Sequence, residues 1–190
     1  MKNKSTLNNN RHMHELFQAR NNQFSEMINS LKITDVKEEK VLKDTKERIK
    51  SQILLTPVLF ELPKIVDDRT ENRQMGPNYL NPLGGQQQVK IVTVEFPFTG
   101  SNELFGVSPD SVSFSDPTIY LPIGNSVPVE IVVEKLDKEE VLQKANKAMS
   151  LTKELIKDIN PQIEGWSKRM ENQIDEHLQA KRQELLDLYS

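Results

Sequence analysis

Histidine, the residue most often used as a metal ligand or an acid–base catalyst, is rare in this chain. Of three histidines, His12 and His14 flank Met13 close to an asparagine-rich beginning, and His177 lies far along the sequence. A zinc site needs several protein ligands, and the chain has no cysteine to supply any of them. His14-Glu15 also lacks a second histidine at the spacing of a zinc protease. We therefore predict neither a metal site nor a cofactor.

Triplets of the form Asp/Glu-x-Lys occur in many metal-dependent nucleases, where carboxylates at strand ends hold divalent cations and the lysine steers water. This sequence contains Asp35-Val36-Lys37, Glu38-Glu39-Lys40 and Asp44-Thr45-Lys46. All of them fall within one charged helical pattern, in which ion pairs along a solvated face explain them better. We interpret these triplets as structural.

Signatures of nucleophilic catalysis and phosphate binding are also missing from the sequence. Gly84-Gly85 lacks the G-x-x-x-x-G-K-[ST] spacing of a phosphate-binding loop, and no serine lies in a G-x-S-x-G elbow. The scarcity of histidine argues against a Ser-His-Asp triad. The sequence therefore predicts that the protein is not an enzyme.

The residues best suited to binding form a short loop between the aromatic positions Phe98 and Phe105. Their side chains offer hydrogen-bond donors and acceptors between two aromatic anchors. We predict a ligand- or partner-binding loop at Thr99, Gly100, Ser101, Asn102 and Glu103. A tight turn closed by its own hydroxyl groups would explain the same residues, so both interpretations stay open.

The overall composition restricts the classes of protein and partner. Of 190 residues, 36% are apolar and 28% are charged, and the mean hydropathy is -0.59. These values indicate a modest core and much solvent-facing helix. The formal net charge of -3 gives no global field that attracts nucleic acid. The lack of cysteine fits a reducing compartment, and no membrane span or signal-peptide core is present, so we predict a cytoplasmic protein without a membrane partner.

Helical spacing of apolar residues predicts a helical hairpin at 11–56, after a disordered tail at 1–10. The first stripe comprises Met13, Phe17, Phe24, Met27, Ile28 and Leu31. The second helix is expected to begin at Asp35, where Glu38 completes a capping box. Its narrow stripe comprises Val41, Leu42, Thr45, Ile49 and Ile53. The other faces are charged, so this helix has only one face for a partner.

Prolines end the hairpin pattern, and 57–88 is predicted to be an extended segment and linker. A short edge strand is compatible with the region around Pro57 and Pro63, because proline cannot donate to a strand ladder. After Val66 the sequence has prolines, glycines and almost no apolar periodicity, which predicts a long loop.

Strict alternation of apolar and polar residues predicts a small antiparallel β module at 89–135. One strand places Val92, Val94, Phe96 and Phe98 on one face, with Thr93 and Glu95 on the other. A second strand alternates Val127, Val129, Ile131 and Val133 with Glu130 and Glu134. SVSF and TIYLPI are shorter candidates, with turns at GSN, SPDS, SDP and GNS. So small a sheet must pack against a helix.

Two C-terminal helices are predicted at 136–190. Asp137 and Glu140 form a capping box at the start of the first, and Asn160-Pro161 is expected to end it. The second helix, from Pro161 to about residue 188, has near-heptad spacing and predicts a coiled-coil-like arm. Its interaction face comprises Trp166, Met170, Ile174, Leu178 and Leu185. For Trp166, packing over the sheet as a core anchor is the favoured interpretation, and binding a partner is the alternative.

Short motifs in the β module and the last helix match a longer signature. The signature has the form V-S-G-D-x-x-L-L-x-x-x-P-S-x-x-x-x-x-P, and its counterparts here are Thr99-Gly100-Ser101-Asn102, Leu104, Pro109, Ser111 and Pro117, then Asn160, Lys181-Arg182 and Leu185-Leu186. This pattern resembles the N-terminal region of a group of uncharacterised bacterial multidomain proteins. Their larger members continue into a domain similar to PD-(D/E)XK nucleases and look like anti-phage defence or restriction effectors.

The resemblance covers about half of the chain, from Val92 to Ser190. It implies a place in a bacterial defence or nuclease-associated protein. The chain stops where the nuclease domain of that group would begin, so the resemblance does not imply nuclease activity here.

The expected architecture is α+β, with a small antiparallel sheet flanked by N- and C-terminal helical pairs and a long C-terminal helix of coiled-coil character. The expected function is a non-enzymatic interaction or oligomerisation module, acting through self-association or a protein partner. One alternative is a nucleic-acid-binding accessory role for the basic residues Lys2, Lys4, Arg11 and Arg20. Another is a small-ligand sensor that uses the 99–103 loop and the segment GPNYLNPLGG.

Overall fold

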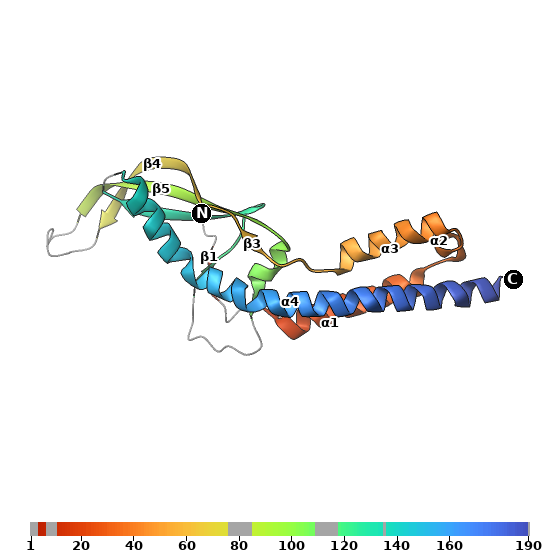
Figure 1. Ribbon diagram of the computed structural model, residues 1–190. Coiled ribbons are helices and arrows are strands. Elements are labelled where there is room, and N and C mark those ends of the chain that lie inside the picture. Colours follow the sequence, from red (N-terminus) through yellow and green to blue (C-terminus); the bar gives the residue numbers. More distant parts are fainter. Residues whose placement is uncertain (1–3, 7–10, 76–84, 109–117, 135, 190) are drawn as a thin grey trace. The chain divides into compact units, whose positions relative to one another are not determined.

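The computed structural model (Figure 1) has mixed helix and sheet, with a small antiparallel sheet and a long C-terminal helix, which confirms the predicted fold class. It describes residues 4–6, 11–75, 85–108, 118–134 and 136–189. The chain divides into two compact units, each assembled from separate segments. Unit 1 comprises Met1–Asn9, Val58–Phe105 and Phe114–Ile156, and unit 2 comprises Asn10–Pro57, Gly106–Ser113 and Lys157–Ser190. The sequence analysis divides the chain into five consecutive segments, but each compact unit combines stretches from several of them.

The sheet of unit 1 is built around the long strand β5 (Gly85–Thr99). On one side β5 pairs antiparallel with β4 (Lys64–Met75) and, at its end, with β3 (Leu59–Phe60). On the other side it pairs antiparallel with β8 (Ser126–Val133). The short edge strand considered around Pro57 and Pro63 is present as β3, whereas the long loop predicted after Val66 is wrong for most of β4 and for the start of β5.

β4 lacks apolar periodicity because it is an edge strand that buries little of its surface. Asp67, Asp68 and Thr70 are all exposed, and charged side chains are usual on sheet edges because they discourage pairing with other chains. Its backbone pairs with β5 from Lys64 opposite Glu95 to Met75 opposite Gly85, with one bulge between Ile65 and Asp67. The pairing with β5 makes this segment a strand, and no local apolar pattern in the sequence of β4 predicts it.

The inner face of the sheet is the core of unit 1, as the alternation predicted. Val92, Val94 and Phe96 are fully buried. On β8 the buried residues are Val127, Val129, Ile131 and Val133. The first part of α4 (Lys138–Leu188) buries Val141, Ala145 and Met149. The predicted cover of the sheet by a helix is supported by Lys153, whose Nζ atom lies 4.6 Å from the centroid of the Phe96 ring.

Two short strands complete the described part of unit 1. β7 (Thr118–Tyr120) lies in the predicted TIYLPI segment, and the Tyr120 backbone N–H donates to the Thr152 Oγ1 of α4 over 3.1 Å. β1 (Lys4–Thr6) pairs antiparallel with β7, and Lys4 Nζ lies 4.8 Å from the Tyr120 ring centroid. The predicted disordered tail is wrong for these three residues. The predicted SVSF strand and most of the SPDS and SDP turns lie outside the described residues.

A tight turn at Gly124-Asn125 leads into β8, as predicted from GNS. The Ile123 N–H donates to the Ser126 carbonyl over 2.8 Å, and Gly124 has a φ of 61°, in the left-handed region. A Cβ atom at Gly124 would meet nothing within 4 Å, so backbone conformation alone restricts this position.

We expect Gly124→Val to lower the free energy of unfolding by about 1–2 kcal/mol, because a β-branched residue is strained at positive φ. Gly124→Asn should have a much smaller effect, since asparagine tolerates the left-handed region. Urea denaturation followed by circular dichroism measures both values. Equal destabilisation by the two variants would contradict the backbone explanation.

Unit 2 contains α1 (Met13–Ser30), α2 (Ile33–Val36), α3 (Glu39–Ile53) and the remainder of α4. It also contains a short parallel pair between β2 (Arg11–His12) and β6 (Val107–Ser108). On α3 the buried residues all belong to the predicted stripe: Leu42, Thr45, Ile49 and Ile53. On α1 the predicted Met13, Phe24 and Ile28 are buried, but Leu16, which the stripe did not include, is buried as well, and Phe17 and Met27 are only half-buried.

The second helix does not begin at Asp35, as predicted. Asp35 is not the cap of a long helix but the third residue of α2, where its Oδ2 accepts a 2.8 Å hydrogen bond from the Lys32 backbone N–H. Glu38 has an extended backbone, and α3 begins at the next residue. The Thr45 hydroxyl donates to the Asp35 carbonyl over 3.0 Å, which fixes the short helix against α3.

The predicted helix break at Asn160-Pro161 is also wrong, because α4, a helix of 51 residues, continues through Pro161. Proline has a φ compatible with a helix, but it lacks a backbone donor and its ring crowds the carbonyl four residues earlier, which together cost about 3 kcal/mol inside a helix. Ile159 and Ile163 are both fully buried on either side of it. Their packing offsets the lost hydrogen bond, since tertiary contacts supply most helix stability in proteins. The start of α4 is as predicted: Asp137 Oδ1 accepts from the Glu139 and Glu140 N–H groups over 2.9 and 3.0 Å.

Candidate functional site

The predicted interaction face of the last helix lies in the core of unit 2. Its five residues are between 0% and 8% exposed: Trp166, Met170, Ile174, Leu178 and Leu185. Trp166 is a core anchor, as favoured, but its neighbour within unit 2 is Phe17 of α1, on which it stacks with ring centroids 5.0 Å apart and 8° between planes. The near-heptad spacing is therefore used for packing within the chain, which leaves little of this face for a partner.

Polar contacts hold the same part of α4 against α3. Lys46 pairs with Asp175 at 2.6 Å, and Lys50 pairs with Glu171 at 2.9 Å. The hydrogen bond that Lys50 donates to the Glu171 carboxylate raises the pKa of Lys50 above its ordinary value. These lysines belong to the charged face of α3 that the sequence analysis interpreted as structural, and their partners lie on another helix rather than within α3. The triplet at Asp44-Thr45-Lys46 thus serves helix packing.

The predicted binding loop is exposed at one end of the sheet. β5 ends at Thr99, Gly100 has a φ of 108°, and a 3-10 helix, η2, spans Asn102–Gly106. The Asn102 side-chain amide donates to the Gly124 carbonyl over 3.0 Å, which ties the loop to the turn before β8. The aromatic anchors do meet, since the Phe98 and Phe105 ring centroids are 4.8 Å apart. A structural role for the loop is thus visible.

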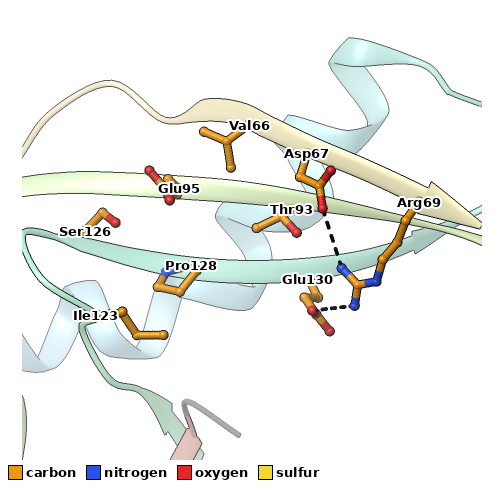
Figure 2. A pocket seen from close by; sticks show the side chains of 9 residues that line it. All are labelled: Val66, Asp67, Arg69, Thr93, Glu95, Ile123, Ser126, Pro128 and Glu130. Atoms are coloured by element: carbon orange, nitrogen blue, oxygen red, sulfur yellow. Dashed lines mark hydrogen bonds and ion pairs between the residues drawn. The ribbon is translucent and has the colours of Figure 1, made fainter. Parts of the chain in front are cut away.

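A hollow of about 450 Å³ lies on the outer face of the sheet, and Figure 2 shows the side chains around it. They come from β4, β5, β8 and the turn before β8: Val66, Asp67, Arg69, Thr93, Glu95, Ile123, Ser126, Pro128 and Glu130. Thr93, Glu95 and Glu130 alternate along their strands with the buried core residues, so they point away from the core. The volume is within the range of ligand sites.

One end of the hollow carries a fixed guanidinium group. Arg69 donates to Glu130 Oε1 on β8 over 2.7 Å and to Glu71 Oε1 on β4 over 2.8 Å. Asp67 lies 3.9 Å from the same guanidinium, and Figure 2 marks its contacts with Asp67 and Glu130. The hydrogen bonds that Arg69 donates to the Glu130 carboxylate and, to a smaller extent, to the Glu71 carboxylate raise the pKa of Arg69. Arg69 thus bridges β4 and β8 across β5.

The other end of the hollow carries an unpaired carboxylate. Glu95 is half-buried on β5, and its carboxylate makes no hydrogen bond or ion pair with any described residue. Lys64 lies opposite it in register, yet the two side chains do not pair. In Figure 2, Glu95 lies near Val66 and Ser126, with Pro128 and Ile123 across the hollow. A bulge in β4 between Ile65 and Asp67 changes the register at this point.

Exposed apolar side chains surround these charges. Val66 is 49% exposed and Ile123 is 50% exposed, and both line the hollow. Val132, further along the outer face of β8, is 44% exposed. The arrangement can bind an amphipathic group, but its described side chains include no nucleophile paired with a general base. Within the described residues, no group of three or more His, Asp or Glu side chains is placed to hold a metal ion.

Sequence analysis identified only part of this surface. The alternation along the strands predicts that Thr93, Glu95 and Glu130 face solvent. The loop predicted after Val66 gave no reason to expect Asp67 and Arg69 beside them. One pattern in the sequence could have indicated a strand here: Asp67, Arg69 and Glu71 are charged and spaced by two residues, as on one face of a strand.

Comparison with protein-family models, curated proteins and solved structures gives no match. Among the described helices, none is both long and apolar enough to cross a membrane.

Proposed function

We propose that this protein is a non-enzymatic protein-interaction module whose docking surface is the outer face of the β4–β5–β8 sheet. The observation that supports the proposal is the combination, on this face, of exposed aliphatic side chains with a hollow of about 450 Å³. Exposed apolar surface rimmed by polar groups is typical of interaction sites. The helical face expected to bind partners is buried within unit 2, so the sheet is the better candidate.

Charge complementarity favours a basic segment of a partner protein as the occupant. Among the described side chains, this face carries the four carboxylates of Asp67, Glu71, Glu95 and Glu130 and two cations, those of Arg69 and Lys64. The excess of negative charge attracts cations and disfavours phosphates. The resemblance to defence-associated proteins suggests a bacterial effector assembly as the context.

Site-specific photo-crosslinking tests the docking surface. A benzoylphenylalanine at Val132 on the outer face is compared with one at Glu154, which is exposed on α4. We expect a discrete adduct from position 132 in cells and none from position 154. The partner is then purified, and its affinity for the protein is measured by calorimetry. Val66→Asp should raise the dissociation constant of this complex at least tenfold.

Leu188→Asp is the matched control, because Leu188 is also an exposed apolar residue, at 71%, but belongs to α4. It should leave the affinity unchanged. Partner affinity that is insensitive to Val66→Asp would contradict the proposal. An adduct between two copies of the chain, with a dimer mass in light scattering across a tenfold concentration range, would also overturn it by assigning the face to self-association.

A further inference from the structure

Glu95 is the least explained ionisable group on the outer face of the sheet. Its side chain is half-buried on the central strand, and no described residue forms an ion pair with the carboxylate or donates a hydrogen bond to it, although Lys64 lies opposite in register. Holding a carboxylate partly out of water without a partner is unfavourable. Every other carboxylate that lines the hollow has a cation nearby, because Asp67 and Glu130 both face Arg69. A positive group is therefore the missing complement at the Glu95 end.

The surroundings of Glu95 match the shape and polarity of a long basic side chain. Val66, Pro128 and Ile123 supply aliphatic surface, and the Ser126 hydroxyl is the other polar side chain at this end (Figure 2). Lysine and arginine side chains combine an aliphatic stem with a cationic head, and they bury the stem while the head remains polar. An aliphatic wall beside a lone carboxylate suits such a side chain.

Arg69 provides an internal example of the same recognition. Its guanidinium lies across the strands and is bound by carboxylates of β8 and β4 at 2.7 and 2.8 Å. A guanidinium presents a planar fork of donors that matches a carboxylate and is more weakly hydrated than an ammonium group. A partly desolvated site thus favours arginine over lysine.

We propose that the hollow binds the guanidinium side chain of an arginine from a partner protein, with the Glu95 carboxylate as its counter-ion. The stem of that arginine lies on Val66, Pro128 and Ile123, and Ser126 Oγ accepts a further hydrogen bond. This inference rests on the proposed docking function of the same face and names the chemistry of its partner.

The test is a titration of ¹⁵N-labelled protein with N-acetyl-arginine methylamide, followed in ¹H–¹⁵N correlation spectra. N-acetyl-citrulline methylamide is the neutral control of the same shape, and the lysine analogue tests the preference for a guanidinium. We expect saturable shifts at Thr93, Glu95 and Ser126 with a millimolar dissociation constant, as a single charge-assisted contact provides. The lysine analogue should bind at least threefold more weakly, and citrulline should give no saturable shifts.

Glu95→Gln keeps the shape of the side chain and removes its charge, so it should weaken arginine binding at least tenfold. Glu61→Gln is the matched control, because Glu61 is an exposed acidic residue between β3 and β4 that does not line the hollow. If Glu95→Gln failed to fold, the comparison of arginine with citrulline on the unaltered protein would still decide.

Any one of three results would overturn the inference. The arginine analogue does not saturate the protein, the citrulline or lysine analogue binds as tightly as the arginine analogue, or Glu95→Gln binds the arginine analogue as tightly as the unaltered protein. Binding of the purified partner to the same variants distinguishes a failure of the arginine site from a failure of the proposed docking surface. If the partner binds Val66→Asp weakly but binds Glu95→Gln normally, the arginine site is rejected and the docking surface is kept. Affinity retained in both variants would remove the docking surface itself.

Discussion

Replacing Phe96 by alanine is expected to lower the free energy of unfolding by about 3–5 kcal/mol, the range for aromatic-to-alanine changes in protein cores. Phe96 is fully buried on the inner face of the central strand, between Val94 and Phe98 in the alternating pattern. The change opens a cavity and also removes the ring over which the Lys153 ammonium lies at 4.6 Å. Burial lowers the pKa of Lys153 below its ordinary value.

Urea denaturation followed by far-ultraviolet circular dichroism measures this effect. Val132→Ala is the matched control, because Val132 belongs to the same sheet but is 44% exposed on the outer face. We expect the control to change the free energy of unfolding by less than about 1 kcal/mol. Similar losses for the two variants would mean that the inner face of the sheet is not the core of unit 1.

Trp166→Ala is expected to destabilise unit 2 by a comparable amount, about 3–5 kcal/mol. Trp166 is 6% exposed, and its ring is nearly parallel to that of Phe17 at 5.0 Å. Ser167, the next residue, donates from its hydroxyl to the Leu55 carbonyl over 2.7 Å, so the substitution disturbs a contact region between α4 and the chain just after α3. Circular dichroism measures the variant, because Trp166 is the only tryptophan and its fluorescence is lost with it.

A double-mutant cycle with Phe17→Ala isolates the contribution of the ring stack. We expect a coupling energy of about 0.5–1.5 kcal/mol between the two positions, as for other aromatic pairs. Trp166→Phe should retain much of the stability, since an aromatic ring remains opposite Phe17. Strict additivity of the two alanine substitutions would show that the rings do not interact.

The strands with one buried face were predictable because their side chains alternate in and out with a period of two. Val92, Val94, Phe96 and Phe98 are all buried, and Thr93 and Glu95 lie on the other face, as the sequence indicates. Helix faces were predictable for the same reason at a period of 3.6 residues. Leu42, Thr45, Ile49 and Ile53, for example, are all buried on α3.

The partners of these faces were not predictable, because periodicity shows that a face is buried and not what covers it. Trp166 was expected over the sheet, and its neighbour within unit 2 is Phe17, 149 positions earlier in the chain. The five residues assigned to an interaction helix pack inside unit 2. Their pattern is the same whether the covering helix belongs to this chain or to another one.

Local sequence patterns were enough to predict the α+β class, the inner face of β5 and β8, the buried stripes of α1 and α3, and the Asp137 cap at the start of α4. Each of these depends on neighbours within a few positions. Three other features emerged only from the folded chain: the polar segment of β4 is a strand, α4 continues through Pro161, and Glu95 borders the Arg69 hollow. These features depend on hydrogen bonds and packing between segments far apart in the chain, and those contacts outweigh the local preference for a linker or a helix end.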